Sequence, residues 1–350
     1  MMTDRKGKKS KAAPRRVLIL QTAFLGDVIL STPFIRAVRR RFQDAVLDIL
    51  VIPENKPLFR ADPNVDGVLT FDKGRLLFKW PAFCRLVLKI RWTKYDLAFS
   101  LQRSMTSSLI MAMGGIPERI GLSGQRLLTR TVKPEKGLHI RDRYLALIRP
   151  FTGQAFDRDT ALHWTDAEEK TADGLIPRGA AGARRVGIAP GSKWPTKRWP
   201  EEYFVELMRN LVRSGAELFL IGGREDRSLC DAILRRSGTA AVNTCGRLSI
   251  LESAALIRRL DLMVTNDSAP LHIADAVGTP VFAIFGPTVR RFGCTPYRPP
   301  DRLFEAELDC RPCGKHGGRR CPQGHFRCMR DVPPESITLA AIEFIRKEKR

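Results

Sequence analysis

The sequence has no long hydrophobic run: no apolar stretch approaches the roughly 20 residues that a helix needs to cross a bilayer. The apolar run at 17–20, which follows a basic N-terminus, is too short for the core of a signal peptide. We therefore expect a cytoplasmic protein without a transmembrane span, beginning with a disordered basic tail at residues 1–15.

Acidic residues are few compared with basic ones. The chain has 37 Asp and Glu against 60 Lys and Arg, a net charge of +23, of which residues 1–155 carry +17 and residues 156–350 carry +6. Such an excess favours a polyanionic partner: a nucleic acid, an anionic membrane or a phosphorylated substrate. A basic surface that serves only solubility is the alternative.

Two phosphate-binding fingerprints are also missing. No GxGxxG follows the first predicted strand and no GxxxxGK[ST] occurs anywhere, so the sequence supports neither a dinucleotide fingerprint nor a P-loop. The composition, 43% hydrophobic and 28% charged, is nevertheless that of a globular protein, and 350 residues suffice for two domains.

Short apolar runs alternate with helical patterns along most of the chain. This alternation predicts an α/β fold with parallel sheets that are covered by helices on both faces. The pattern lapses around 150–183, which predicts a linker between two domains. Strands are expected at 17–20, 46–52, 68–71, 95–101, 185–189, 217–221, 260–265 and 281–285.

The stretch at 264–288, VTNDSAPLHIADAVGTPVFAIFGPT, predicts a strand, a helix over 270–276 and a second strand. Asp267 and Ser268 are typical N-cap residues, and Pro270 suits the first helical turn. A helix N-terminus at the carboxyl end of a parallel strand favours an anion, most simply a phosphate. His272, in the first turn, could add a hydrogen bond to it.

A second polar turn, PGSKWPTKRWP, follows the strand predicted at 185–189. Gly191 and Ser192 provide backbone and hydroxyl donors there. Lys193, Lys197 and Arg198 place three cations within six residues, which suits a pyrophosphate, although any one of them could be a solvated loop residue.

A third turn, GGRED, follows the strand predicted at 217–221. Glu225 or Asp226 could accept hydrogen bonds from ribose or sugar hydroxyls, or could instead face the dipole of the next helix. Because the carboxyl ends of parallel strands meet at one edge of a sheet, the three turns predict a single site.

The first half offers Gly26 and Asp27 at the first strand-to-helix turn. Asp27 either contributes to chemistry at the carboxyl edge of the sheet or caps the following helix. Further on, 73–94 has seven basic residues and no acidic one, and a stripe of Leu76, Trp80, Phe83, Val87 and Ile90 at helical spacing. This helix is expected to pack on its own sheet or to lie on an anionic membrane surface.

The cysteines cluster at 310–328. Cys310, Cys313, Cys321 and Cys328 are interspersed with two histidines, and only the first pair has a spacing common in zinc sites. Reduced structural cysteines and a structural zinc are both compatible with this pattern.

In combination, these motifs resemble the ADP-heptose:lipopolysaccharide heptosyltransferases, glycosyltransferase family 9, and within it most resemble the heptosyltransferase II branch. The resemblance covers roughly residues 15–345. Besides the three turns above, it rests on VLILQTAFLGDVILSTPFIRAVRRRF, YDLAFSLQRSMTSSL, GIPERIGL and the C-terminal CxPC…C…HxRCM segment.

The resemblance implies a GT-B architecture, two Rossmann-like domains facing across a cleft. The acceptor domain would span 16–160 and the nucleotide-sugar domain 184–335, including the cysteine-rich segment 310–328. A linker at 161–183 would join them, and a C-terminal helix at 336–350 would follow.

The resemblance also implies an inverting transfer that needs no metal and no cofactor. Asp27 matches the family's proposed general base, and Lys197 matches the lysine that neutralises the leaving diphosphate. The donor-binding positions implied are Gly191, Ser192, Lys197, Glu225, Asp267, Ser268, Ala269 and His272, with Ala269 standing where the family often has glycine.

The expected function is transfer of heptose from ADP-heptose to the phosphorylated inner core of lipopolysaccharide, a Kdo-lipid A type acceptor. The expected partners are these two molecules and the inner face of the cytoplasmic membrane, with no nucleic acid. Alternatives are a GT-B glycosyltransferase with another donor or glycan acceptor and, more remotely, a basic nucleic-acid-binding protein.

Overall fold

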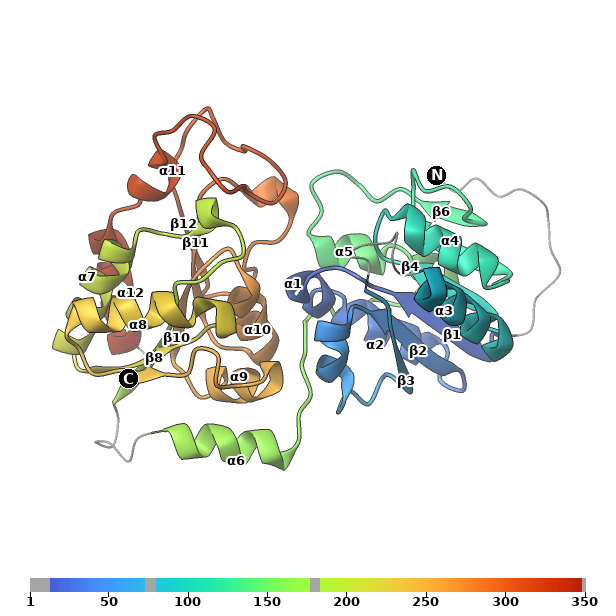
Figure 1. Cartoon of the computed structure of the whole chain (residues 1–350), viewed down its shortest axis with the longest axis horizontal. Helices are drawn as coiled ribbons and strands as arrows, with labels where there is room; N and C mark the ends of the chain where they lie inside the picture. The colour runs from blue at the N-terminus through green and yellow to red at the C-terminus, as the bar shows by residue number, and fades with distance from the viewer. Residues whose placement is uncertain (1–12, 73–79, 177–182, 348–350) are drawn as a thin grey trace. The chain divides into compact units, whose positions relative to one another are not determined.

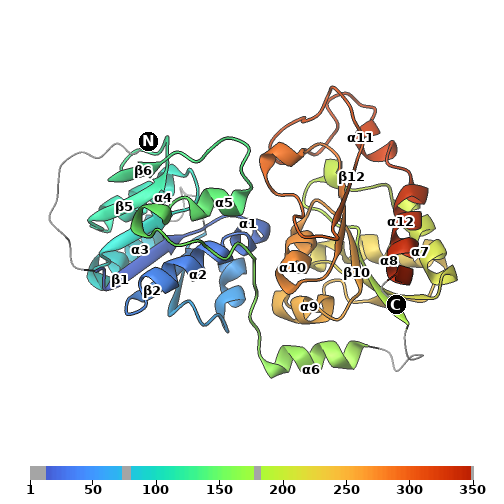
Figure 2. The same cartoon turned by 180° about the vertical axis from the view of Figure 1, so that it is seen from behind.

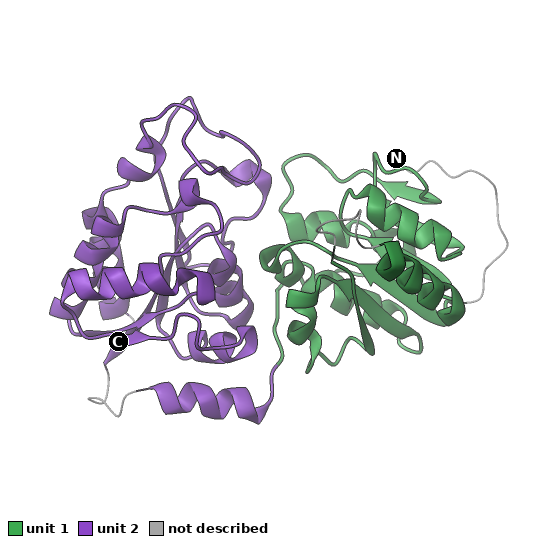
Figure 3. Cartoon of the chain, in the orientation of Figure 1, with its two compact units in different colours: residues 1–163 green, residues 164–350 purple. Residues whose placement is uncertain are grey.

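The computed structural model describes residues 13–72, 80–176 and 183–347, so most of the predicted tail at 1–15 lies outside the described residues. The chain divides into two compact units, residues 1–163 and 164–350, each with its own sheet and core (Figure 3). No helix among the described residues has the length and apolarity needed to cross a bilayer.

Both units contain a six-stranded parallel sheet with the strand order of a Rossmann fold. Unit 1 has the order β3-β2-β1-β4-β5-β6, and unit 2 has the order β12-β11-β10-β7-β8-β9 (Figure 1). In each, the first strand of the unit lies centrally, between the strands that come second and fourth. The α/β fold predicted from the sequence is thereby confirmed.

The strands of unit 1 are β1 (Arg16–Leu20), β2 (Val46–Val51), β3 (Gly67–Thr70), β4 (Leu97–Ser100), β5 (Glu118–Leu122) and β6 (Arg130–Val132). Its helices are α1 (Leu25–Ile29), α2 (Thr32–Arg41), α3 (Trp80–Thr93), α4 (Met105–Met113) and α5 (Ile140–Leu145).

Helices cover both faces of the unit 1 sheet (Figures 1 and 2). On one face α3 packs against α4 and buries Phe83, Val87 and Ile90 in a shared core, as the predicted stripe requires. Trp80 of that stripe is exposed and Leu76 lies outside the described residues. On the other face α2 packs against α5.

The strands of unit 2 are β7 (Arg184–Ala189), β8 (Ala216–Leu220), β9 (Val242–Asn243), β10 (Leu262–Asn266), β11 (Val281–Phe285) and β12 (Arg302–Glu305). Its helices are α6 (Asp166–Leu175), α7 (Glu201–Arg213), α8 (Arg227–Ser237), α9 (Ile250–Ile257), α10 (Ala269–Val277), α11 (Arg327–Arg330) and α12 (Pro334–Lys347).

The core of unit 2 is continuous across its central strands. Val264 of β10 pairs with Ile188 of β7 on one side and Phe282 of β11 on the other, and all three are fully buried. Helices α7, α8 and α12 pack over this face, while α9 and α10 pack together on the other. Every residue of β10 and β11 is buried, as expected for central parallel strands.

The segment 161–183, predicted as a linker, contains the helix α6. Its N-terminus is a capping box, in which Thr165 and Glu168 satisfy each other's backbone groups. The helix packs against α9, and Arg259 pairs with Glu169 and Asp173. Much of this segment therefore belongs to unit 2 rather than connecting two bodies.

Candidate functional site

The carboxyl edge of the unit 2 sheet brings three predicted turns together. β10, β7 and β8 are neighbouring parallel strands, so the loops that follow them emerge at the same edge. Between β7 and β10 the chain connections diverge to opposite sides of the sheet, and this reversal is where open α/β sheets form a ligand crevice.

A buried ion pair joins two of these loops. Lys197, in the short helix Pro195–Lys197, places its Nζ 2.5 Å from Oδ2 of Asp267, and both residues are more than nine-tenths buried. The hydroxyl of Thr288, after β11, donates to the same Oδ2 at 2.6 Å. Asp267 thus holds the lysine in place, a role that the sequence did not assign to it.

Asn266, the last residue of β10, fixes the backbone of the loop after β7. Its amide donates to the carbonyl of Pro190 at 2.8 Å, and its Oδ1 accepts from the backbone N–H of Trp199 at 3.1 Å. Trp199 is 1% exposed, stacks edge-on against Phe204, and donates through its indole to the carbonyl of Val332. The loop that carries Lys197 is therefore anchored at both ends.

The helix α10 begins where the sequence predicts an anion site. Ser268 is the N-cap residue in extended conformation, Ala269 and Pro270 open the first turn, and His272 is buried in it. The helix ends at Gly278, whose φ of 81° is the left-handed conformation that glycine adopts easily. The first-turn amides and the helix dipole make this N-terminus electropositive.

Gly191 and Asp226 pack together across the loops after β7 and β8. A Cβ at Gly191 would lie 2.1 Å from Oδ1 of Asp226, so a side chain there would displace this carboxylate. The other carboxylate oxygen of Asp226 accepts from the N–H of Gly223 at 3.1 Å, and burial raises the pKa of this carboxyl. The neighbouring Glu225 is exposed. The two acids that the sequence could not distinguish thus have different environments, and only Glu225 extends into solvent.

The three cations predicted to cluster, Lys193, Lys197 and Arg198, lie in different environments. Only Lys197 is buried in the ion pair with Asp267. Arg198 turns back on its own loop and donates to the carbonyl of Ser192 at 2.9 Å, and Lys193 is exposed. Ser192 is itself buried, with its hydroxyl 3.4 Å from the N–H of Trp194.

The cysteine-rich segment supports the Lys197 loop from outside. Thr196 makes three hydrogen bonds with Gly318: its hydroxyl donates at 3.0 Å and accepts at 2.7 Å, and its backbone N–H donates at 3.2 Å. A Cβ on Gly317, at φ 80°, would lie 3.2 Å from Cγ of Lys197. The sequence suggested reduced structural cysteines or a structural zinc for this segment and gave no sign of this contact.

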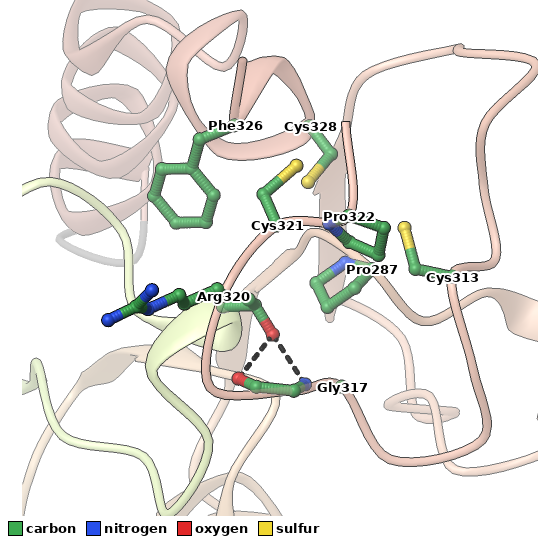
Figure 4. A pocket seen from close by; sticks show the side chains of 10 residues that line it. Pro287, Cys313, Gly317, Arg320, Cys321, Pro322, Phe326 and Cys328 are labelled. Atoms are coloured by element: carbon green, nitrogen blue, oxygen red, sulfur yellow. Dashed lines mark hydrogen bonds between the residues drawn. The ribbon is translucent and has the colours of Figure 1, made fainter. Parts of the chain in front are cut away.

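Three of the four clustered thiols line a pocket of about 50 Å³, where the sulfurs of Cys321 and Cys328 point toward one another (Figure 4). Burial first, and then Cys313 and Cys321, raise the pKa of Cys328 to about 11, so it is a thiol at neutral pH. Within the described part of the chain, no three His, Cys, Asp or Glu side chains are placed to hold a metal ion.

Asp27 lies at the corresponding edge of the unit 1 sheet. It is half-buried in the first turn of the short helix α1, where the sequence predicted a turn. Its loop is held from two sides: Asn55 donates to the carbonyl of Ala23 at 3.0 Å, and Thr22 donates to Gln102, after β4, at 3.1 Å. The aspartate is thus carried by a fixed backbone.

Two Rossmann-type sheets in one chain are the GT-B architecture, and the second sheet carries a buried lysine, a helix N-terminus and glycine turns at one edge. Residues 83–321, more than half of the chain, match the sequence profile of glycosyltransferase family 9 (heptosyltransferase). The chain belongs to this family.

The chain is also similar to individual members of this family, both in sequence and in structure. Lipopolysaccharide heptosyltransferase 2 of Escherichia coli K12 is 25% identical over 340 residues, covering 92% of this chain and 96% of the relative. The solved E. coli ADP-heptose lipopolysaccharide heptosyltransferase II has a TM-score of 0.78 at 22% identity, covering 96% of this chain and all of that one. A family 9 glycosyltransferase from Veillonella parvula reaches 0.82 at 21% identity, covering 95% and 98%.

Proposed function

We propose that this protein transfers heptose from ADP-heptose to the phosphorylated inner core of lipopolysaccharide, a Kdo-lipid A type acceptor, at the cytoplasmic face of the inner membrane. Unit 2 holds the donor and unit 1 the acceptor. The observation that carries the proposal is the buried Lys197–Asp267 pair beside the N-terminus of α10. We infer ADP-heptose as the donor and lipopolysaccharide as the acceptor because the names of the relatives state them.

The donor diphosphate fits the unit 2 edge by charge. The first-turn amides of α10 from Ser268 onward, with Ala269 and His272, face its oxygens. Lys197 contributes the cation, which Asp267 keeps oriented. Gly191 and Ser192 shape the loop beside it.

The ribose of ADP is assigned to Glu225. It is exposed beside the loop after β7, whereas the carboxylate of Asp226 is already engaged with Gly223. A carboxylate accepts from vicinal hydroxyls in other folds with this strand order.

The reaction is an inverting displacement. The carboxylate of Asp27 takes the proton of the acceptor hydroxyl as its oxygen bonds to the anomeric carbon of heptose. The bond from that carbon to the diphosphate oxygen breaks, and ADP leaves with the electron pair. Lys197 and the dipole of α10 stabilise the charge that develops on the diphosphate, the role that a metal ion has in other transferases, and we therefore propose that the transfer is metal-independent.

Mass analysis of the product made from ADP-heptose and a defined truncated acceptor tests this function. We expect the acceptor to gain one heptosyl residue, with chelator present or absent. Turnover with another nucleotide sugar alone would contradict ADP-heptose as the donor. Turnover onto another glycan alone would contradict the lipopolysaccharide acceptor.

A further inference from the structure

The side of α3 that faces away from the sheet exposes large hydrophobic side chains. Trp92 is 77% exposed, Trp80 58% and Leu88 46%. Leu88 and Trp92 are four residues apart and therefore adjacent on one side of the helix. Phe83 and Ile90, on the opposite side, are buried in the core of unit 1.

These exposed side chains contribute little to folding. The inner side of α3 already fills the core against β1, β3 and α4. Large apolar side chains held in water are unfavourable, and a contiguous group of them marks an interaction surface. The outer side of α3 is thus suited to a partner.

Cations surround these hydrophobic side chains. Arg85, Lys89 and Arg91 are exposed on the same helix, and no acidic residue occurs between Asp72 and Asp96. Arg85 is three residues before Leu88, and Lys89 directly follows it, so charge and apolar surface are interspersed rather than separated. We call this surface the α3 outer face: Trp80, Arg85, Leu88, Lys89, Arg91 and Trp92.

We propose that the α3 outer face is the surface by which this protein docks on an anionic lipid membrane. Tryptophan and leucine enter the headgroup boundary, and the cations pair with anionic headgroups. This inference rests on the proposed function, whose acceptor is held in a membrane, and it names the surface responsible.

Charge complementarity favours a lipid surface over other occupants. A second copy of the chain would place these cations against one another. The N-terminal sixteen residues carry seven Lys and Arg against one Asp, so they would be repelled as well. An anionic bilayer matches both the charge and the exposed aromatic rings.

The position of α3 suits this role. The helix follows β3, so its N-terminal end lies at the carboxyl edge of the parallel sheet, the edge at which the Asp27 loop follows β1. Docking through α3 would bring the catalytic edge of unit 1 to the membrane, from which the inner core projects.

Vesicle flotation of the full-length protein tests the surface directly. We compare vesicles of phosphatidylcholine with vesicles containing about 30% phosphatidylglycerol, using Leu88→Ser with Trp92→Ser, and separately Arg85→Gln with Lys89→Gln. The first pair leaves every charge, including those of the basic tail, unchanged. Leu339→Ser, at a 69% exposed position of α12, is the matched control.

We expect the wild-type protein and Leu339→Ser to bind the anionic vesicles. The Leu88/Trp92 variant should bind at least about tenfold more weakly, because burial of two large side chains is lost. The Arg85/Lys89 variant should lose about fivefold per cation. Wild-type-like binding by both folded variants would overturn the proposal. So would a change of oligomeric state, rather than of vesicle binding, in the Leu88/Trp92 variant.

Transfer assays separate this proposal from the proposed function. With acceptor in anionic vesicles, the Leu88/Trp92 variant should transfer heptose about tenfold more slowly than wild type, and with detergent-dispersed acceptor at the wild-type rate. Equal loss in both formats would overturn docking through α3. If wild type transfers in neither format while the vesicle binding differs as expected, the proposed function fails and the docking surface stands.

Discussion

The two units share one strand order but use it differently. In unit 2, Lys197, Asp267 and Thr288 at the sheet edge are buried and bonded to one another. Unit 1 exposes more hydrophobic surface. Among the described residues, seven of the eight exposed large hydrophobic side chains belong to it, and Leu339 is the exception. Residues 1–163 also hold 30 Lys and Arg against 14 Asp and Glu, compared with 30 against 23 in the rest.

This difference between the units fits the ligands that we propose for them. A small charged nucleotide sugar is held by a few preorganised groups, and burial keeps those groups in place. An acceptor anchored in a membrane needs a wide surface complementary to lipid and phosphate, for which exposed cations and aromatic rings are suited. We therefore propose that the same topology carries a preformed donor site in unit 2 and a docking surface in unit 1.

The largest expected effect is on the chemistry assigned to unit 1. Asp27→Asn should reduce the rate of transfer about 100- to 10,000-fold, because the amide cannot accept the proton of the acceptor hydroxyl. Product formation under single-turnover conditions measures it, with Asp44→Asn, an exposed aspartate of the same unit, as control. Wild-type turnover by the Asp27 variant would remove this residue as the base.

In unit 2, Lys197→Ala should impair stability and transfer together. Removing the cation leaves Asp267 buried without its ion pair, which lowers the free energy of unfolding by about 3–5 kcal/mol. Denaturant unfolding and transfer rates measure the two effects. Lys193→Ala, in the same loop but exposed, should have little effect on either, and equal effects of both substitutions would contradict the distinction between them.

The sequence predicted which turns meet at the carboxyl edge of the unit 2 sheet, but not how their side chains are paired. The strand–helix–strand pattern at 264–288 and its glycine stop were readable because capping and apolar runs are local signals. The pairing of Lys197 with Asp267 joins residues 70 positions apart, and that of Thr196 with Gly318 spans 122. Such contacts depend on tertiary packing and leave no local pattern.

The sequence analysis did not predict β6 or α6, and each omission has a physical cause. β6 is three residues long, none of them buried, so it lacks the apolar run of a central strand. α6 is rich in charge and contains Gly174, a composition typical of linkers, although the capping box of Thr165 and Glu168 was a readable signal for it.

A smaller effect should distinguish the two adjacent acids of unit 2. Glu225→Gln should weaken ADP binding several-fold, about 1 kcal/mol, without changing stability.

Asp226→Asn should change the pH dependence of stability instead. Because burial raises the pKa of Asp226 in the folded protein, wild type loses stability as pH rises through that pKa, and the variant should not. Unfolding at pH 4 and pH 7 measures the effect on stability, and ADP titrations measure the effect on binding. Weaker ADP binding by the Asp226 variant, with unchanged binding by the Glu225 variant, would assign the ribose contact to Asp226.

The smallest effect should come from outside the proposed donor site. Gly317→Ala forces a methyl group against Thr196 and Lys197 at a left-handed φ, which should cost about 1–2 kcal/mol of stability and weaken ADP binding a few-fold. Gly314→Ala, in the same segment with open space around it, is the control. If the two variants bind ADP alike, the cysteine-rich segment does not support the Lys197 loop.

The central claim is that unit 2, and not Asp27 of unit 1, binds the donor. Calorimetric titration of ADP-heptose into wild type, Asp27→Asn and Lys197→Ala, without acceptor, tests it. We predict wild-type affinity for the Asp27 variant and at least about tenfold weaker binding for the Lys197 variant. Donor binding lost equally in both variants would contradict it.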